Sequence, residues 1–254
     1  IYGSPFTMAR LRQKLKERCP DLPIPLRVLD YNKKQKIGAF DIEMVALTHS
    51  IPDPAGLIIN VGGETIFHTG DWKFDDDPQL GPLSDIDRLD RLGEDGVLAM
   101  IGDSTNAMIE GSTASEAVAR QGLIDVIKAE KGRVAVTCFA SNVARLNSLI
   151  EAAKEAERSP MLIGRALNRA YEAARSCGYL DNWPDMIPME EFGLIPRENI
   201  LLICSGSQGE PRSAMTRVAN GTHHMVSLEA GDTALFSSRE IPGNEVAIQK
   251  VHDN

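Results

Sequence analysis

The chain has 254 residues, of which 43% are hydrophobic and 5% aromatic, and its formal net charge at pH 7 is −9. This length fits one large domain or two small ones, with enough apolar residues for a substantial core. No apolar run approaches the roughly 18 residues of a membrane-spanning helix, so we expect no membrane partner. The acidic balance argues against a broadly basic nucleic-acid-binding surface, although a local basic groove is compatible with it.

The cysteines give a prediction about the compartment. Four of them are scattered along the chain without a C-x-x-C pair: Cys19, Cys138, Cys177 and Cys204. That spacing fits neither a zinc ribbon nor a disulfide scaffold, which favours reduced thiols in a cytoplasmic protein. The chain begins at Ile1 in mid-pattern, as a trimmed fragment would, and no secretory signal heads it.

The first hundred residues predict one helix followed by short strands. Ser4 and Pro5 are typical of a helix cap and a first helical residue. We expect strands at 24–29, 37–47, 57–61, 65–68 and 97–101. Two consecutive glycines at 62–63 can supply the positive φ angles of a two-residue hairpin turn. Such a hairpin would bring His49 and Asp71 to the same edge of a sheet.

After residue 115 the pattern changes to a regular alternation of strands and helices. Thr113 and Glu116 have the spacing of a capping box before a helix that Gly132 ends. Expected strands at 133–139, 161–163, 200–204 and 233–237 alternate with expected helices at 142–158, 166–177 and 211–219. This alternation predicts an α/β fold with a mainly parallel sheet covered by helices on both faces. We place a domain boundary near Ser115, which gives domains 1–115 and 116–254.

His49 and Asp71 are the first candidates for chemistry. Imidazole and carboxylate are donors that zinc takes in hydrolytic sites, but two donors do not make a site, and both residue types also serve in turns. His68 lies three positions before Asp71 and is either a packed strand residue or a support for the site. The acidic run 75–77 is expected to be a solvated turn.

Six segments of the chain resemble one family. THSIPD and HTGDWKFD are similar to metal motifs of the metallo-β-lactamase superfamily. The similarity continues in IGDSTNAMIEGSTASE, TCFASNVAR, CSGSQGEPRSAMTRVANGTH and FSSREIPGNE. In this order the blocks resemble the RNA-processing β-CASP branch, and within it ribonuclease J.

The resemblance implies a fold and an activity. It implies part of a metallo-β-lactamase αββα domain over 1–115 and most of a β-CASP domain over 116–254. It implies zinc-dependent hydrolysis of single-stranded RNA, as 5′→3′ exonuclease and endonuclease, in RNA processing and decay. By motif match, His49 would bind one zinc ion, Asp71 would bridge two, and Asp103 would have a catalytic role. From the residue pattern alone, an Asx-type cap of the following turn is the preferred interpretation of Asp103.

Loops that leave the parallel strands at their carboxyl ends are candidates for phosphate binding, because ligands bind there in open parallel sheets. Ordinary strand-to-helix loop chemistry explains the same small residues. The candidates are Ser141, Asn142, Arg145, Ser205, Gly206, Ser207, Gln208, Ser238 and Arg239, with Arg165 and Arg212 as further charge partners.

The resemblance is incomplete. The His-x-His-x-Asp-His block of the family is absent, as are its later histidine motifs. We therefore expect these 254 residues alone to bind metal weakly or not at all, and not to cleave RNA. Alternatives are a hydrolase of the same fold acting on DNA or a small ester, and a non-catalytic RNA-binding scaffold. The family also implies a homodimer or higher oligomer.

Overall fold

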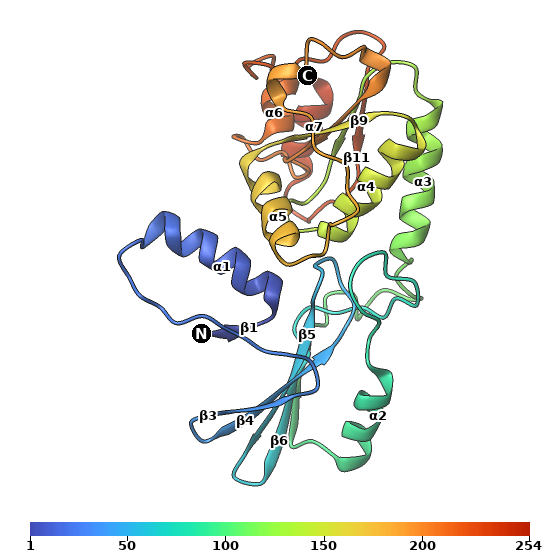
Figure 1. Ribbon diagram of the computed structural model, residues 1–254. Coiled ribbons are helices and arrows are strands. Elements are labelled where there is room, and N and C mark those ends of the chain that lie inside the picture. Colours follow the sequence, from blue (N-terminus) through green and yellow to red (C-terminus); the bar gives the residue numbers. More distant parts are fainter. The chain divides into compact units, whose positions relative to one another are not determined.

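A computed structural model describes residues 1–254, which divide into two compact units (Figure 1). Unit 1 consists of Ile1–Ala117 and Ala173–Tyr179, and unit 2 of Val118–Glu172 and Leu180–Asn254. None of the helices has both the length and the apolar character that crossing a bilayer requires.

Unit 1 is built on a five-stranded sheet. Its strands lie in the order β3 (Lys34–Ile37), β4 (Phe40–Ala46), β5 (Ala55–Val61), β6 (Glu64–His68) and β7 (Ala99–Ile101). The pairs from β3 to β6 are antiparallel, and β7 is parallel to β6. The single strand expected at 37–47 was wrong. Gly38 has a φ of 63°, and the chain turns there so that Ile37 pairs with Phe40.

The glycine-tipped hairpin is confirmed. Gly62 and Gly63 have φ angles of 61° and 85°, and Val61 pairs directly with Glu64 on either side of them. Two consecutive positive φ angles match the twist of the flanking strands, which sets the register of the whole ribbon.

A long helix lies beside this sheet. Helix α1 (Pro5–Arg18) follows β1 (Tyr2–Gly3), which pairs in parallel with β2 (Arg27–Val28). Of the strand expected at 24–29, only the two residues of β2 form a strand. Ser4 occupies the cap position, but its hydroxyl donates to Asp53 at 2.9 Å and does not accept from the helix. The buried Asp53 carboxylate accepts from the Phe6 amide at 2.8 Å, so a residue distant in sequence caps the helix.

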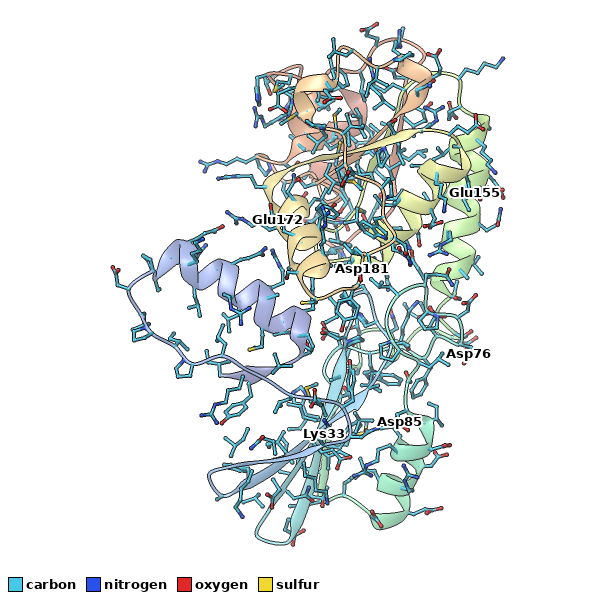
Figure 2. The ribbon with its side chains drawn as sticks, viewed as in Figure 1. Lys33, Asp76, Asp85, Glu155, Glu172 and Asp181 are labelled. Atoms are coloured by element: carbon cyan, nitrogen blue, oxygen red, sulfur yellow. The ribbon has the colours of Figure 1, made fainter.

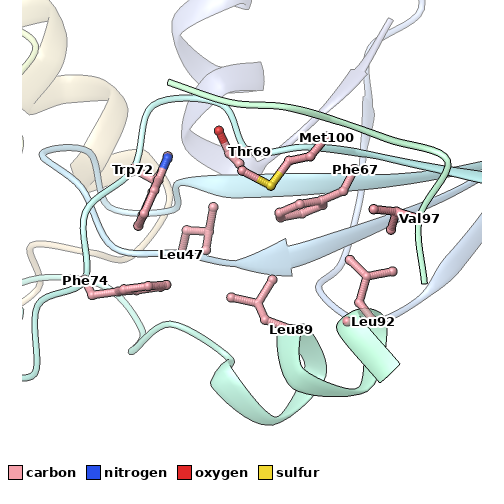
Figure 3. Close-up of a pocket in the computed structure, with 10 residues that line it drawn as sticks. Leu47, Phe67, Thr69, Trp72, Phe74, Leu89, Leu92, Val97 and Met100 are labelled. Carbon is pink, nitrogen blue, oxygen red and sulfur yellow. The ribbon is translucent and has the colours of Figure 1, made fainter. Parts of the chain in front are cut away.

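Helix α2 (Ile86–Asp95) was not predicted. Asp85 caps it by accepting from the Arg88 amide, and Leu89 and Leu92 pack against the sheet. Between helix and sheet lies an apolar cavity of about 260 Å³ (Figure 3). Its lining comprises Leu47, Phe67, Thr69, Trp72, Phe74, Leu89, Leu92, Gly93, Val97 and Met100.

Unit 2 contains the expected parallel sheet. Its strands lie in the order β11 (Thr233–Phe236), β8 (Val134–Thr137), β10 (Ile200–Cys204) and β9 (Ser159–Ile163), and all pairs are parallel. The helices that lie wholly or mainly in this unit are α3 (Glu116–Ala129), α4 (Val143–Glu155), α5 (Arg165–Ser176), α6 (Ala214–Ala219) and α7 (Glu245–Asp253), with 3₁₀ turns at Met189–Glu191 and Arg197–Asn199.

Side chains of β10 alternate between the two faces of this sheet. Leu201 and Ile203 pack into a cluster with Leu146 and Leu149 of α4. Leu202 and Cys204 pack into a second cluster with α6 and α7 on the opposite face. Burial on both faces explains the continuous apolar sequence of this strand and confirms the predicted fold class.

Candidate active site

The structure brings His49, Asp71 and Asp103 together in unit 1. They line one polar pocket of about 260 Å³, whose lining is His49, Asp71, Trp72, Lys73, Asp103, Thr105, Asn106 and Thr113. Since the pocket is polar and open, the three side chains face a space that a polar ligand can enter.

The topology of the sheet explains this meeting. Strands β4 and β6 are both antiparallel to β5, so they run in the same direction, and β7 runs parallel to β6. His49, Asp71 and Asp103 each follow the carboxyl end of one of these strands by two or three residues. The connections that follow β4, β6 and β7 therefore all leave the same end of the sheet.

Hydrogen bonds join these connections to one another. The Lys73 amide donates to the Thr48 carbonyl at 2.9 Å, and the Thr48 hydroxyl donates to the Lys73 carbonyl. The Asp103 amide donates to the Thr69 hydroxyl at 3.1 Å. Residues next to the three candidates thus fix their backbones relative to each other, as a site for chemistry requires.

Asp75 corrects the expectation of a solvated turn at 75–77. Its side chain is 1% exposed and forms an ion pair with Lys73 at 2.8 Å. It accepts from the amides of Asp77 and Glu116, at 3.1 and 3.0 Å. Because Glu116 is the first residue of α3, Asp75 together with the Ser115 hydroxyl caps that helix, and the capping box with Thr113 was wrong. Asp75 ties the Asp71 loop to the start of α3.

Charges in the pocket influence one another. Burial lowers the pKa of His49, Asp71 and Asp103 act in the opposite direction, and Lys73 lowers it further. The hydroxyl and the amide of Thr105 lower the pKa of Asp103, so this carboxyl stays ionised. Asp103 therefore does form the Asx-type contact with the turn that follows it, and its carboxylate faces the pocket as well.

The donor set is too small for a complete metal centre. His49 and Asp71 are of the types that zinc takes, but the structure contains no group of three or more histidine, cysteine or acidic side chains placed to hold a metal ion. A zinc site needs about three protein ligands. The residues of this chain alone therefore do not fit a bound zinc ion.

His68 and Gly70 shape the turn that carries Asp71. His68 is exposed, and its Nδ1 atom accepts from the Gly70 amide at 3.0 Å. Gly70 has a φ of 64°, a conformation that disfavours every side chain with a Cβ atom. This finding places His68 in support of the turn, outside the pocket lining.

Replacing Gly70 by alanine should therefore lower the free energy of unfolding by about 1–2 kcal/mol, the cost of a left-handed non-glycine residue. Urea denaturation measures it. The control is Gly93→Ala in α2, where nothing lies within 4 Å of an added Cβ atom. A helical glycine replaced by alanine should instead raise stability by about 0.5–1 kcal/mol. Equal effects of the two changes would refute this account of the turn.

Trp72 separates the polar pocket from the apolar cavity, because it lines both. Figure 3 shows its ring above Leu47, with Phe74 below, and the centroids of the Trp72 and Phe74 rings are 4.9 Å apart. These contacts support a packing role beside the site.

The strand-end loops of unit 2 hold the other candidates, and several of these have structural partners. Asn142 caps α4 by accepting from the Arg145 amide at 2.8 Å. The Arg145 guanidinium donates to the carbonyl and hydroxyl of Ser237. Gln208 donates to the Arg239 carbonyl and accepts from the Ile241 amide, so it joins the loops after β10 and β11.

Other candidates in these loops have buried polar atoms without a protein partner. The hydroxyls of Ser207 and Ser238 are buried and have no hydrogen-bond partner within the protein. Thr137, at the end of β8, has a third such hydroxyl, which sequence reasoning missed because threonine is common in strands. Ser205 accepts weakly from Ala214 at 3.4 Å, and Gly206 has a φ of 117°. The candidate charge partners on the surface are Arg165, Arg212 and Arg239. The loop candidate Ser141 is also exposed.

Comparison with known proteins identifies relatives. Residues 131–254 match the family model "Ribonuclease J, beta-CASP domain". A ribonuclease J of Sinorhizobium meliloti is 42% identical over 251 residues, which cover 99% of this chain and 44% of that protein. A ribonuclease J2 of Bacillus subtilis is 34% identical over 254 residues, which cover 100% and 46%. The chain thus spans less than half the length of these curated relatives.

A solved structure supports the fold. A crystal structure of a protein of unknown function from Enterococcus faecalis V583 matches with a TM-score of 0.55 and 16% sequence identity. The match covers 80% of this chain and 52% of that one. At this identity the likeness concerns the arrangement of helices and strands alone.

Proposed function

Because the chain belongs to the ribonuclease J family, we propose that it contributes the hydrolytic pocket and the RNA-gripping lobe of a metal-dependent ribonuclease. The observation that carries this proposal is the meeting of His49, Asp71 and Asp103 in one polar pocket. The substrate is single-stranded RNA, hydrolysed from the 5′ end and also internally, in RNA processing and decay. Residues 1–115 belong to the metallo-β-lactamase domain and 116–254 to the β-CASP domain.

The proposed cofactor is zinc, two ions per site. Bound zinc ions lower the pKa of a bound water and stabilise charge on the oxygens of a phosphodiester. His49 would hold one ion and Asp71 both, with further ligands supplied by sequence beyond these 254 residues. Asp103 stays ionised. Its carboxylate can therefore accept a proton, or a hydrogen bond from an RNA hydroxyl, near the phosphorus. Lys73 adds a cation to the same wall of the pocket.

The strand-end loops of unit 2 are the proposed phosphate-binding part. Three buried hydroxyls without partners, on Thr137, Ser207 and Ser238, lie at or just beyond the carboxyl ends of three neighbouring strands of the parallel sheet. A buried hydroxyl without a hydrogen bond is costly, and a phosphate oxygen would satisfy it. Arg239 is exposed next to Ser238 and supplies a positive charge. We also propose that the protein is cytoplasmic and forms a homodimer or higher oligomer.

Hydrolysis by the full-length protein tests the function. His49→Ala and Asp71→Ala should each lower the rate on 5′-phosphorylated single-stranded RNA by at least about 100-fold, because loss of even indirect support for a metal ligand costs about 10–100-fold. His224→Ala is the control, since this exposed histidine of unit 2 does not line the pocket or support the turn that carries Asp71. Full activity of His49→Ala, or an equal loss in His224→Ala, would contradict the assignment.

A further inference from the structure

Positive charge is concentrated at one end of this acidic chain. The first 36 residues contain nine basic and three acidic residues, a net charge of +6. The other 218 contain 18 basic and 33 acidic residues, a net charge of −15. Acidic side chains such as Glu155 of α4 and Glu172 of α5 lie on the surface of unit 2 (Figure 2). Net charge therefore favours contact of a polyanion with the first 36 residues over contact with the rest of the chain.

Helix α1 carries most of this positive charge. Arg12, Lys14, Lys16 and Arg18 are exposed, and none of them forms an ion pair. Lys14 and Arg18 are four positions apart, as are Arg12 and Lys16, so each pair forms a row about 6 Å long on the helix. At about 100° per residue the two rows lie on opposite sides of the helix, and they flank the half-buried Leu11 and Leu15.

Helix stability alone does not account for these residues. Basic side chains in the last turn interact favourably with the helix dipole, which explains Lys16 and Arg18. Arg12 and Lys14 lie before that turn, and the helix has no acidic residue in its first turn to balance them. Helix α2 of the same unit contrasts with α1, because it has four acidic and two basic residues. Figure 1 shows α1 and α2 on different sides of the five-stranded sheet.

We propose that the exposed basic side chains of α1 bind the phosphate backbone of single-stranded RNA, outside the polar pocket. This inference rests on the proposed function, which supplies the occupant, and on the charge complementarity between four unpaired cations and a polyanion. Lysine and arginine on an exposed helix contact phosphates without reading bases. The site therefore contributes affinity that is independent of base sequence, of the 5′-phosphate and of the bound metal.

The test uses the 254-residue chain and 5′-phosphorylated or 5′-hydroxyl oligouridylate. The variant carries Arg12→Gln, Lys14→Gln, Lys16→Gln and Arg18→Gln, since glutamine keeps the helix propensity. We expect its dissociation constant to rise at least tenfold at low salt, equally for both RNAs. The slope of the logarithm of the binding constant against the logarithm of the salt concentration should become shallower by up to about 2.8. Each phosphate contact on a single strand contributes about 0.7 to this slope, and the variant removes four cations. Circular dichroism checks that α1 remains folded.

The control removes four exposed lysines elsewhere, with Lys128→Gln, Lys131→Gln, Lys154→Gln and Lys250→Gln. An equal loss in this control would overturn the inference, because total charge would then explain the binding. If the α1 variant binds like the parent chain while Arg239→Gln weakens binding of 5′-phosphorylated RNA, the inference fails and the proposed function stands. Failure of the parent chain to bind either RNA would overturn both. If the 254-residue chain binds through α1 more tightly to phosphatidylserine vesicles than to RNA, the helix binds a membrane surface instead and the inference fails.

Discussion

Replacement of Asp75 by asparagine should lower the free energy of unfolding of unit 1 by about 2–3 kcal/mol. The change removes the negative charge of a side chain that is 1% exposed and leaves the Lys73 ammonium, itself 22% exposed, without its partner. Breaking a fully buried ion pair costs about 3–5 kcal/mol, and partial solvation of Lys73 reduces that figure. The change also weakens the hydrogen bond that the Glu116 amide, at the start of α3, donates to this side chain.

The two tryptophans make this measurement specific, because Trp72 lies in unit 1 and Trp183 in unit 2. Urea denaturation followed by fluorescence in a Trp183→Phe background reports on unit 1. Asp76→Asn is the matched control, since Asp76 is the exposed neighbour of Asp75 and should change stability by less than about 0.5 kcal/mol. If Asp76→Asn and Asp75→Asn destabilise equally, Asp75 has no special structural role.

A second large loss is expected for Asp232→Asn in unit 2. The Asp232 carboxylate is 0% exposed and accepts from the amides of Arg133 and Glu229, at 2.8 and 2.9 Å. It also accepts from the Arg197 guanidinium at 2.8 Å and pairs with the buried Arg133, which lies over the Phe192 ring. The neutral asparagine side chain would leave the buried Arg133 without its counter-charge. The free energy of unfolding of unit 2 should therefore fall by about 3 kcal/mol.

The stabilisation by Asp232 should depend on pH. Burial alone would raise the pKa of Asp232, but the Arg197 guanidinium and the Glu229 and Arg133 amides outweigh it and hold the pKa below its ordinary value. A lowered folded-state pKa gives stability that is present above the ordinary carboxyl pKa of about 3.9 and is lost as the pH falls through the folded value. Asp232→Asn should therefore unfold with a smaller acid dependence than the parent chain.

Trp183 fluorescence in a Trp72→Phe background measures both effects in unit 2. Glu229→Gln is the control, because this exposed carboxylate also pairs with Arg197, at 3.0 Å, and a surface pair contributes about 0–1 kcal/mol. Stability of Asp232→Asn within about 0.5 kcal/mol of the parent chain would show that this network is not important for the fold.

Local sequence determined the elements that local chemistry controls. The Gly62-Gly63 turn needs two positive φ angles, which glycine supplies, so its hairpin and the resulting edge could be predicted. Strand β10 could be predicted to the residue, because five consecutive apolar residues indicate burial on both faces. The position of His49 beside Asp71 followed from the first of these features.

Contacts between distant residues could not be predicted in this way. Asp53 caps α1 from 47 residues away, and Asp75 caps α3 from 41 residues away. In the sequence Asp75 is one of three consecutive aspartates, and nothing local distinguishes the buried one from its exposed neighbours. Helix α2 was missed because six of its ten residues are charged, which leaves only a short apolar row to indicate a helix.

Zinc content, measured by mass spectrometry on protein freed of loosely bound metal, tests the central claim most directly. The claim is that His49 and Asp71 are part of a two-zinc site that these 254 residues do not complete. We predict two zinc ions per full-length chain, a loss of zinc in His49→Ala and Asp71→Ala but not in His224→Ala, and no tightly held zinc on the 254-residue chain. Two tightly bound zinc ions on that chain alone, or full zinc content after both substitutions, would contradict the account.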